Sequence, residues 1–591
     1  MKTVLVGINS KYIHTCLAIW YLKANIECGG SCPPADGFAK EDNYVLSHKI
    51  IAREFTINDQ KDNILNEIYK EKPEILAFSC YIWNFEMVCL LSMEIKKLLP
   101  GCKIILGGPE VSYNADEVLE ENAAVDFVLC GEGEEVFSEL HWDIINNSSG
   151  YKALKGIAFR ENGTVVYNEG FNLVSHLDKI IPPYTPELLE AVQGRILYYE
   201  SSRGCPFSCS YCISSTFNGV RYFPLDRVKQ DLAVLLLYKP KLIKFVDRTF
   251  NCNKQRARAI IEHIISLDCD TVFHFEAAAD LFDDEMLKIL SNAQKGRIQF
   301  EIGLQTTNSN TLAEIQRVTD ICRLKANVGK ILGFGNMHIH LDLIAGLPYE
   351  DLESFKISFN EVYEMRPHQL QLGFLKMLKG SKIRNEAQKH GYTYKRYSPY
   401  EILGNSYISF EDILLLKDVE EVLERYFNSN RFIKSLEFIE KRLFENPFEL
   451  YYKLSLFCRG NKYLDRPVSY RENILILYSF IKEAVTDIKI LEKFRWHMVF
   501  DFLSSDSSCA IPDCLKDPGD IVPLSTIHQL LQDEDFIKEN LPAFAGDQAR
   551  NILKKVFFIH IPDAEAAQRT VLFDYTQKDS ISGKFRSVFL E

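Results

Sequence analysis

The sequence RGCPFSCSYC, residues 203–212, places three cysteines, Cys205, Cys209 and Cys212, in one short loop. Thiolates are soft ligands that suit zinc or an iron–sulfur cluster. A structural zinc site usually takes four ligands as two separated pairs, whereas three thiols on one loop can hold three corners of a cubane and leave the fourth iron open. The spacing therefore favours an iron–sulfur cluster over zinc-bound or simply buried cysteines.

The residues on either side of this loop alternate predicted strands with possible helices. The predicted strands are residues 196–200, 242–246, 272–277, 298–304, 338–344 and 369–375. Such a repeat indicates a partial or complete βα barrel, whose active site lies at the carboxyl ends of its strands. The first strand ends at Glu200, five residues before Cys205, so the thiols are expected at the active-site end.

Residues 1–145 also alternate strands and helices. Apolar runs at residues 3–8, 44–46, 74–79, 103–106 and 125–129 predict a parallel, doubly wound sheet of the flavodoxin or Rossmann type. Ser79, Gly107-Gly108 and Gly131 follow three of these strands, where ligands of such sheets bind. The glycines can admit a large flat ligand or merely form tight turns, and they lack the full dinucleotide-binding pattern.

Composition limits the class of protein. The chain has 591 residues, 47% of them hydrophobic, a formal net charge of −13 and 16 cysteines. The acidic balance does not suggest wholesale binding to nucleic acid or anionic lipid, and no apolar run is long enough to span a bilayer. We expect a cytoplasmic protein with reduced thiols, bound neither to membrane nor to nucleic acid.

Turn signals and changes of pattern along the sequence predict four segments. Residues 1–145 form the first α/β domain, and residues 146–193 form a connector with a β-hairpin at Asn162-Gly163. Residues 194–400 form the barrel. Residues 401–591 form a mainly helical domain, in which strands are predicted only at 556–561 and 571–575.

The CxxxCxxC arrangement with Tyr211 before its last cysteine resembles the radical S-adenosylmethionine superfamily. Further barrel blocks, FVDRTFN (245–251), FEAAADL (275–281), EIGLQT (301–306) and DLIAGLPYE (342–350), extend the likeness. Three upstream blocks, FSCYIWNFE (78–86), ILGGPEVS (105–112) and CGEGEEVF (130–137), look like the cobalamin-binding module of the class B enzymes. The last third resembles the extra carboxyl-terminal domain of one uncharacterised branch of that class.

The resemblance implies three cofactors. A four-iron four-sulfur cluster would be held by Cys205, Cys209 and Cys212, and S-adenosylmethionine would chelate its open iron. Cobalamin would lie on the first domain. An external flavodoxin- or ferredoxin-type donor would supply the electron that cleaves S-adenosylmethionine to a 5′-deoxyadenosyl radical.

The resemblance also implies the binding residues. Those expected to line the corrin and its nucleotide tail are Ser79, Tyr81, Gly107, Gly108, Glu110, Gly131 and Glu132. Those expected near S-adenosylmethionine are Tyr211, Asp247, Glu276 and Gln305. Residue type alone leaves a structural salt bridge open for Glu276, and an ion pair with Arg248 open for Asp247.

One departure from related cobalamin proteins concerns the lower face of cobalt. The Asp-x-His-x-x-Gly motif that supplies an axial histidine is missing from the sequence, and His14 is the nearest candidate. We therefore predict that cobalt has no histidine ligand.

The resemblance favours a methyltransferase that acts on an unactivated carbon of a small-molecule or peptide substrate, through the deoxyadenosyl radical and methylcobalamin. Related enzymes with the same two domains perform ring closure or rearrangement without methyl transfer, and this is the first alternative. A non-catalytic iron–sulfur and cobalamin sensor is the second. A sensor needs an effector domain, and the sequence shows no DNA-binding or kinase signature.

Overall fold

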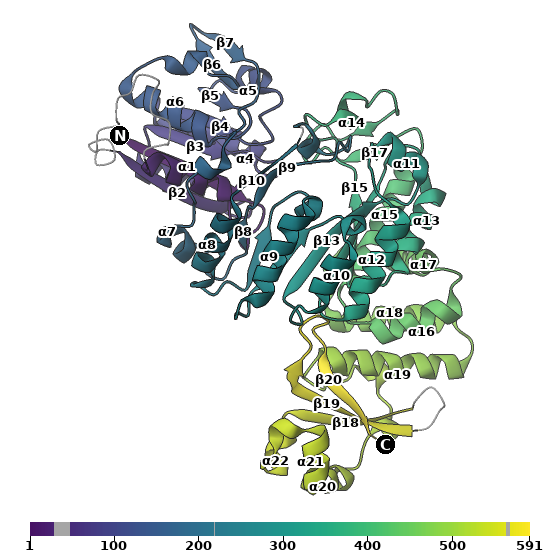
Figure 1. Ribbon diagram of the computed structural model, residues 1–591. Helices are drawn as coiled ribbons and strands as arrows, with labels where there is room; N and C mark the ends of the chain where they lie inside the picture. The colour runs from purple at the N-terminus through teal and green to yellow at the C-terminus, as the bar shows by residue number, and fades with distance from the viewer. Residues whose placement is uncertain (29–47, 218, 563–567, 591) are drawn as a thin grey trace. The chain divides into compact units, whose positions relative to one another are not determined.

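The computed structural model describes residues 1–28, 48–217, 219–562 and 568–590. The chain divides into two compact units. Figure 1 labels their helices and strands. The first comprises Met1–Glu301, Leu312–Asn327 and Leu375–Asn405, and the second comprises Ile302–Thr311, Val328–Phe374 and Ser406–Glu591.

The first unit begins with a seven-stranded sheet of order β2-β1-β3-β4-β5-β6-β7. Its first five strands run parallel and are β1 (Lys2–Asn9), β2 (Lys49–Thr56), β3 (Ile75–Ser79), β4 (Lys103–Gly107) and β5 (Phe127–Leu129). The helices between them are α1 (Leu17–Glu27), α3 (Lys61–Glu71), α4 (Phe85–Leu98), α5 (Ala115–Glu121) and α6 (Glu134–Asn146).

Helices cover both faces of this sheet. Val4, Val6 and Ile8 alternate along β1 and share a buried cluster with apolar residues of α3 and α4. On the opposite face α1 packs against α6, and the α6 residue His141 hydrogen-bonds Thr3 of β1 at 2.8 Å. Alternation along a strand directs successive side chains to opposite faces, so β1 is covered on both sides. The predicted doubly wound sheet is confirmed.

The second strand of this sheet was not predicted. The strand predicted at residues 44–46 lies outside the described residues, and the second strand is β2, which the sequence analysis did not identify. β2 is an edge strand, and its Arg53 and Glu54 interrupt the apolar run that was used to find strands. Helix α1 begins at Leu17, because residues 10–16 form a loop at the end of β1.

The hairpin predicted at Asn162-Gly163 is present and extends the sheet. β6 (Ile157–Glu161) pairs antiparallel with both β5 and β7 (Thr164–Asn168). Asn162 and Gly163 have φ of 51° and 83°. Two positive φ values in a two-residue loop match the twist of a hairpin, which explains the asparagine–glycine pair.

The barrel strands form a sheet of order β15-β14-β13-β12-β11-β8. They are β8 (Leu197–Tyr199), β11 (Leu242–Phe245), β12 (Val272–Glu276), β13 (Ile298–Gln305), β14 (His338–Ala345) and β15 (Gln369–Phe374). Neighbouring strands β8 and β11, β11 and β12, β12 and β13, and β14 and β15 run parallel. The helices that follow them include α9 (Lys254–Ser266), α10 (Asp284–Ser291), α12 (Ile321–Phe334) and α13 (Leu352–Tyr363). All six predicted strands are present, and the predicted partial barrel is confirmed.

Within the second unit, the carboxyl-terminal segment begins with five long helices: α15 (Phe410–Leu423), α16 (Ile433–Leu443), α17 (Pro447–Gly460), α18 (Tyr470–Ala484) and α19 (Ile488–Ser505). The mainly helical segment that the sequence predicts is therefore present. Asn446 caps α17 by accepting a hydrogen bond from the Glu449 amide, and Pro447 occupies its first turn. This Asn-Pro pair is a helix-start signal.

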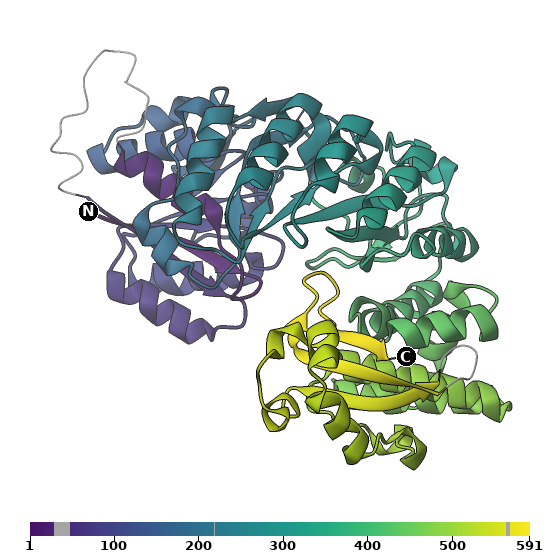
Figure 2. The same cartoon turned by 60° about the horizontal axis from the view of Figure 1, so that its bottom comes forward.

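A three-stranded antiparallel sheet of β18 (Val556–Pro562), β19 (Gln568–Lys578) and β20 (Phe585–Leu590) ends the chain. Helix α19 packs against β18 and β20 (Figure 2). β18 and β19 were predicted, but β20 was not. Over the part of the chain that the structure describes, every helix is too short or too polar to cross a bilayer.

Candidate active site

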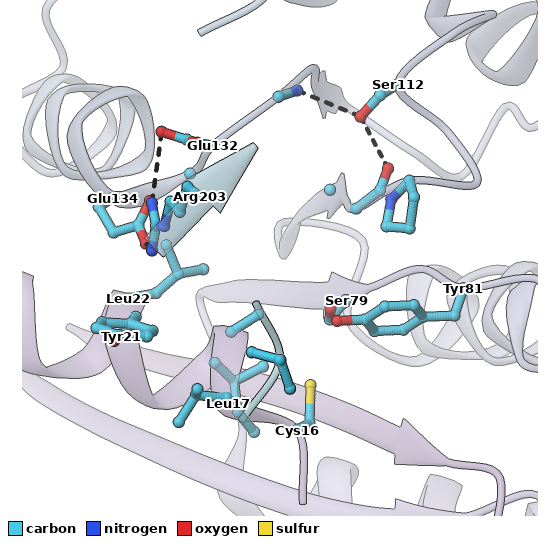
Figure 3. A pocket seen from close by; sticks show the side chains of 18 of the residues that line it. Cys16, Leu17, Tyr21, Leu22, Ser79, Tyr81, Ser112, Glu132, Glu134 and Arg203 are labelled. Carbon is cyan, nitrogen blue, oxygen red and sulfur yellow. Dashed lines mark hydrogen bonds and ion pairs between the residues drawn. The ribbon is translucent and has the colours of Figure 1, made fainter. Parts of the chain in front are cut away.

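A cavity of about 840 Å³ opens at the carboxyl edge of the first sheet, within the first unit (Figure 3). Residues at the ends of β1, β3, β4 and β5 line one side of it. The other side includes Arg203 and Gly204 of the hairpin strand β9 (Ser202–Cys205) and Ile213, which directly follows Cys212. Ligands of doubly wound sheets bind at this edge, so the cavity lies where the sequence analysis expected one.

The residues predicted to contact cobalamin fall into two groups. Six of the seven line the cavity: Ser79, Tyr81, Gly107, Gly108, Gly131 and Glu132. Glu110 does not line it, although Pro109 and Ser112 beside it do. Its side chain is 4% exposed and faces Lys379 and Tyr400 instead.

The glycines around the cavity serve different purposes. Gly108 and Gly131 have φ of 107° and 94°, and a Cβ on them would lie 2.5 Å from the Cys80 oxygen and 2.3 Å from the Asn172 oxygen, respectively. The chain's own backbone therefore explains both glycines. A Cβ on Gly107 would approach only the Leu129 oxygen, at 3.9 Å, so this glycine leaves the cavity wall open.

Ser112 connects the two glycine loops. Its hydroxyl donates to the Gly108 oxygen at 2.8 Å and accepts from the Gly131 amide at 3.3 Å (Figure 3). The sequence analysis quoted Ser112 within a block but assigned it no role.

Cys16, Ser79 and Tyr81 lie close together in the cavity wall (Figure 3). The nearby Ser79 side chain offsets only a small part of the rise that burial causes in the pKa of Cys16 and of Tyr81. Burial raises the pKa of Cys16 to about 12, so the thiol is neutral at physiological pH. Tyr81 stacks on Trp83 at 4.5 Å, and Trp83 donates to the Ile8 oxygen at 3.0 Å.

A network of paired charges forms another part of the wall. Arg203 lies within 4 Å of carboxylate oxygens of Glu132, Glu134 and Glu200, and Arg221 also bonds Glu132. Burial alone would raise the pKa of Glu132, but the Arg221 hydrogen bond and the Arg203 charge outweigh it and hold the pKa below its usual value. Glu132 was predicted to contact cobalamin, and its carboxylate is already engaged by these arginines.

His14 also lines the cavity, and its Nδ1 lies 2.6 Å from the Tyr198 hydroxyl. Burial, with the nearby charge of Lys11, lowers the pKa of His14. The imidazole is therefore neutral at physiological pH. That cobalt has no histidine ligand stays a prediction.

The cysteine loop lies between β9 and β10 (Gly219–Tyr222), two antiparallel strands in which Cys205 pairs with Gly219. A Cβ on Gly204 would lie 2.3 Å from the Gly219 oxygen, so the strand before Cys205 needs a glycine. Cys209 is 6% exposed, and Cys205 and Cys212 are half-buried.

The spacing of the three sulfur atoms discriminates between metals. Two thiolates on one zinc ion, each at about 2.3 Å, can be no more than about 4.6 Å apart. The three sulfurs do not all lie within 4.8 Å of one another. The donor set therefore fits a larger, polynuclear cluster better than a single ion.

Arg317 contacts this loop and was not identified from the sequence. Its Nη1 lies 3.8 Å from the Cys209 sulfur and 3.1 Å from the Tyr211 hydroxyl. Burial raises the pKa of Cys209, and the Arg317 charge offsets part of that rise. No local pattern could reveal the contact, because 108 residues separate Arg317 from Cys209.

The barrel residues predicted near S-adenosylmethionine lie in different surroundings. Asp247 is 1% exposed and accepts hydrogen bonds from Ser201 and Ser202, which fix the turn before the cysteine loop. Arg248, the partner considered for Asp247, instead lines the cavity. Glu276 is half-buried at the carboxyl end of β12.

Gln305 lies in the second unit, at the end of β13. Its φ is 75°, which is uncommon for a residue other than glycine, and its buried Oε1 has no hydrogen-bond partner among the described residues. A strained residue with an unpaired acceptor is typical of a ligand contact.

Comparison with known proteins agrees with this geometry. Family models match as "B12 binding domain" over residues 4–141, "Radical SAM superfamily" over 199–362 and "Protein of unknown function (DUF4080)" over 388–573. The chain thus combines the two domains of cobalamin-binding radical S-adenosylmethionine enzymes. Cobalamin, S-adenosylmethionine and a four-iron four-sulfur cluster are the cofactors that this pair of domains implies.

Among curated proteins, the chain is 24% identical over 316 residues to the cobalamin-dependent radical SAM methyltransferase TokK of Streptomyces tokunonensis, covering 50% of this chain and 46% of TokK. It is 22% identical over 368 residues to an anaerobic magnesium-protoporphyrin IX monomethyl ester cyclase of Cereibacter sphaeroides, covering 59% of each. The chain thus spans about half the length of the curated relatives it matches. Among solved structures, the cobalamin-dependent radical enzyme OxsB aligns with a TM-score of 0.57 at 15% identity, over 85% of this chain and 78% of OxsB.

Proposed function

We propose that this radical S-adenosylmethionine enzyme transfers a methyl group to an unactivated carbon of its substrate. The observation that carries the proposal is the shared cavity, lined by the strand-end loops of the cobalamin module and by residues on both sides of the cysteine loop. When bound there, the cofactors supply hydrogen abstraction by a carbon radical and a cobalt-carried methyl group. Methyltransferases such as TokK among the similar proteins support this outcome.

The residues of the chain prepare the chamber in two ways. Cys205, Cys209 and Cys212 would hold the cluster, with Arg317 beside Cys209. Gly107 leaves room for a flat ligand at the end of β4.

The wall itself supplies few free charges or nucleophiles that could react with the cofactors or the substrate. The thiol of Cys16 is neutral because its pKa is raised to about 12, and the charges of Glu132 and Arg203 are paired with each other. Paired charges and a protonated thiol leave the wall without a free charge or a thiolate nucleophile. We propose that an external flavodoxin- or ferredoxin-type protein supplies the electron.

The decisive experiment uses anaerobically reconstituted protein with S-adenosylmethionine that carries a deuterated methyl group. Candidate substrates are incubated with it, and products are followed by mass spectrometry. A product that gains the labelled methyl group supports the proposal. A product formed without label contradicts methyl transfer and favours ring closure or rearrangement, the second candidate, which the similarity to the cyclases supports.

A further inference from the structure

We propose that residues 377–400, here called the clamp segment, hold the cavity loops of the cobalamin module and the cysteine loop in fixed mutual positions. The segment follows β15 and includes α14 (Lys382–Asn385) and β16 (Thr393–Tyr394). It lies in the first compact unit, together with both sets of loops. The proposal is independent of the reaction that the enzyme performs.

The first contact holds the loop after β4. Glu110 lies in the middle of that loop, between residues that line the cavity, but its carboxylate points to the clamp segment. Lys379 Nζ lies 3.0 Å from Glu110 Oε1, and the Tyr400 hydroxyl donates to the same oxygen. The Lys379 side chain is 15% exposed, so the ion pair is largely shielded from water.

Two further contacts hold the loops of the cobalamin module. The Ser398 hydroxyl donates to the carbonyl oxygen of Ile82, which lies between the cavity residues Tyr81 and Trp83. Gly380, with φ of 80°, lies against the ring of Tyr113, another cavity residue. A Cβ on Gly380 would come within 2.2 Å of that ring, so the approach requires a glycine.

The last contact holds the cysteine loop. The Ile383 amide donates to the carbonyl oxygen of Ser210 at 2.9 Å. Ser210 lies between Cys209 and Tyr211, and its own amide donates to the Ile315 oxygen at 2.9 Å. The clamp segment therefore contacts Glu110, Ile82 and Ser210. Each of these residues lies next in sequence to a residue of the cavity or of the cysteine loop.

The clamp segment is closed on itself, so its contacts have a fixed spacing. The Met377 amide donates to the Tyr400 oxygen at 2.9 Å, which joins the two ends of the segment. Arg384 stacks over the Tyr400 ring at 4.9 Å and donates to the Met377 oxygen at 2.7 Å. A closed segment that contacts both loops transmits a shift of one loop to the other. The region matched as DUF4080 begins inside it, at residue 388, which assigns a positioning role to the first part of that region.

The test compares the full-length, anaerobically reconstituted protein with two variants. Lys379→Met removes the ion pair to Glu110. Lys395→Met is the matched control, because Lys395 pairs with Glu401 at 3.0 Å near the end of the same segment and does not contact the loops. Two readouts need no substrate: the Kd for hydroxocobalamin by absorption titration, and amide hydrogen exchange of residues 107–113 and 205–212.

We expect Lys379→Met to raise the Kd about tenfold and to accelerate exchange in both loops, including the cysteine loop that Lys379 does not contact. Lys395→Met should match the wild type in both readouts. Wild-type Kd and exchange in Lys379→Met would overturn the proposal, as would faster exchange confined to residues 107–113.

Lys379→Met leaves Glu110 as an unpaired buried charge and can lower stability for that reason alone. The double variant Glu110→Gln/Lys379→Met removes both charges. We expect it to unfold at the same temperature as Lys395→Met while keeping the raised Kd and the faster exchange in both loops. A return to wild-type Kd and exchange in the double variant would show that the unpaired charge, rather than the lost contact, caused the effect, and would overturn the proposal.

Discussion

The cysteine loop and the loops after β4 and β5 look equally suggestive in the sequence, but their residues have different roles in the structure. The three cysteines have sulfurs that do not all lie within 4.8 Å of one another, which is too far for three thiolates on one metal ion. By contrast, Glu110 and Glu132 pair with Lys379 and Arg221, and backbone contacts explain Gly108 and Gly131. Carboxylates and glycines have many structural uses, whereas three thiols in one loop have few, so the cysteines are the safer functional prediction.

The largest effect is expected at the cysteine loop. Cys209→Ala removes one of three thiol ligands, and we expect the reconstituted variant to lose its cluster and all activity that depends on it. Iron and sulfide analysis of oxygen-free protein measures this. Cys322→Ala, at an exposed cysteine, should retain the wild-type content. An intact cluster in Cys209→Ala would refute the ligand assignment.

The next effect tests whether the carboxylates of the cavity wall are structural. Arg203→Met leaves Glu134 and Glu200 without their ion-pair partner in a buried setting. Breaking a buried pair from one side costs about 3–5 kcal/mol, so we expect a loss of that order in the free energy of unfolding in urea. Lys70→Met, which breaks an exposed pair with Glu67, should change it by less than about 1 kcal/mol. Equal losses in the two variants would contradict the structural role.

A third test concerns Glu350, a carboxylate of the block DLIAGLPYE. Burial raises the pKa of Glu350 to about 7 from a usual 4.5, and hydrogen bonds from Thr306 and Ser358 offset only part of that rise. Between pH 4.5 and pH 7, Glu350 is protonated in the folded protein but ionised in the unfolded chain. Its contribution therefore lowers the free energy of unfolding as the pH rises from 4.5 to 7.

Glu350→Gln removes this titration. We expect it to be more stable than the wild type at pH 8, by about 3 kcal/mol at most, and to lose that advantage near pH 4.5. Urea unfolding at the two pH values measures the difference. An advantage of equal size at both would show that the charge of Glu350 is not its cause.

The smallest expected effect concerns Gly107 and Gly131, which lie at the ends of the adjacent strands β4 and β5. Gly131→Ala places a Cβ 2.3 Å from the Asn172 oxygen at a positive φ, and we expect it to lower the free energy of unfolding by about 1–3 kcal/mol. Gly107→Ala has room for its Cβ, so we expect nearly unchanged stability but a higher Kd for cobalamin. Thermal unfolding and absorption titration distinguish the two. Wild-type cobalamin affinity in Gly107→Ala would remove Gly107 from the ligand wall.

Much of the fold follows from the sequence because apolar strands in parallel sheets are continuous and easily seen. The six barrel strands and the Asn162-Gly163 hairpin are of this kind. β2 was missed because Glu54 uses its carboxylate for distant partners, accepting from Asn9 and Trp20. Such a residue makes an edge strand look like a loop.

The residues of the candidate site also differ in how far they could be predicted from the sequence. The cysteine loop is one continuous sequence, so its spacing carries the chemistry. Arg317 and Lys379 reach their partners across long stretches of chain, and only the fold brings them together. Whether Glu110 would face the cavity or the clamp segment could not be read from its neighbours either, because both directions suit a carboxylate.

The central claim is that the cysteine loop and the cobalamin module serve one chamber. Electron paramagnetic resonance of the full chain, with a reduced cluster and paramagnetic cobalt(II) cobalamin both bound, tests it most directly. We predict that each signal is broadened or split by the other, relative to protein that holds one cofactor alone. A spectrum equal to the sum of the two separate spectra would contradict the claim.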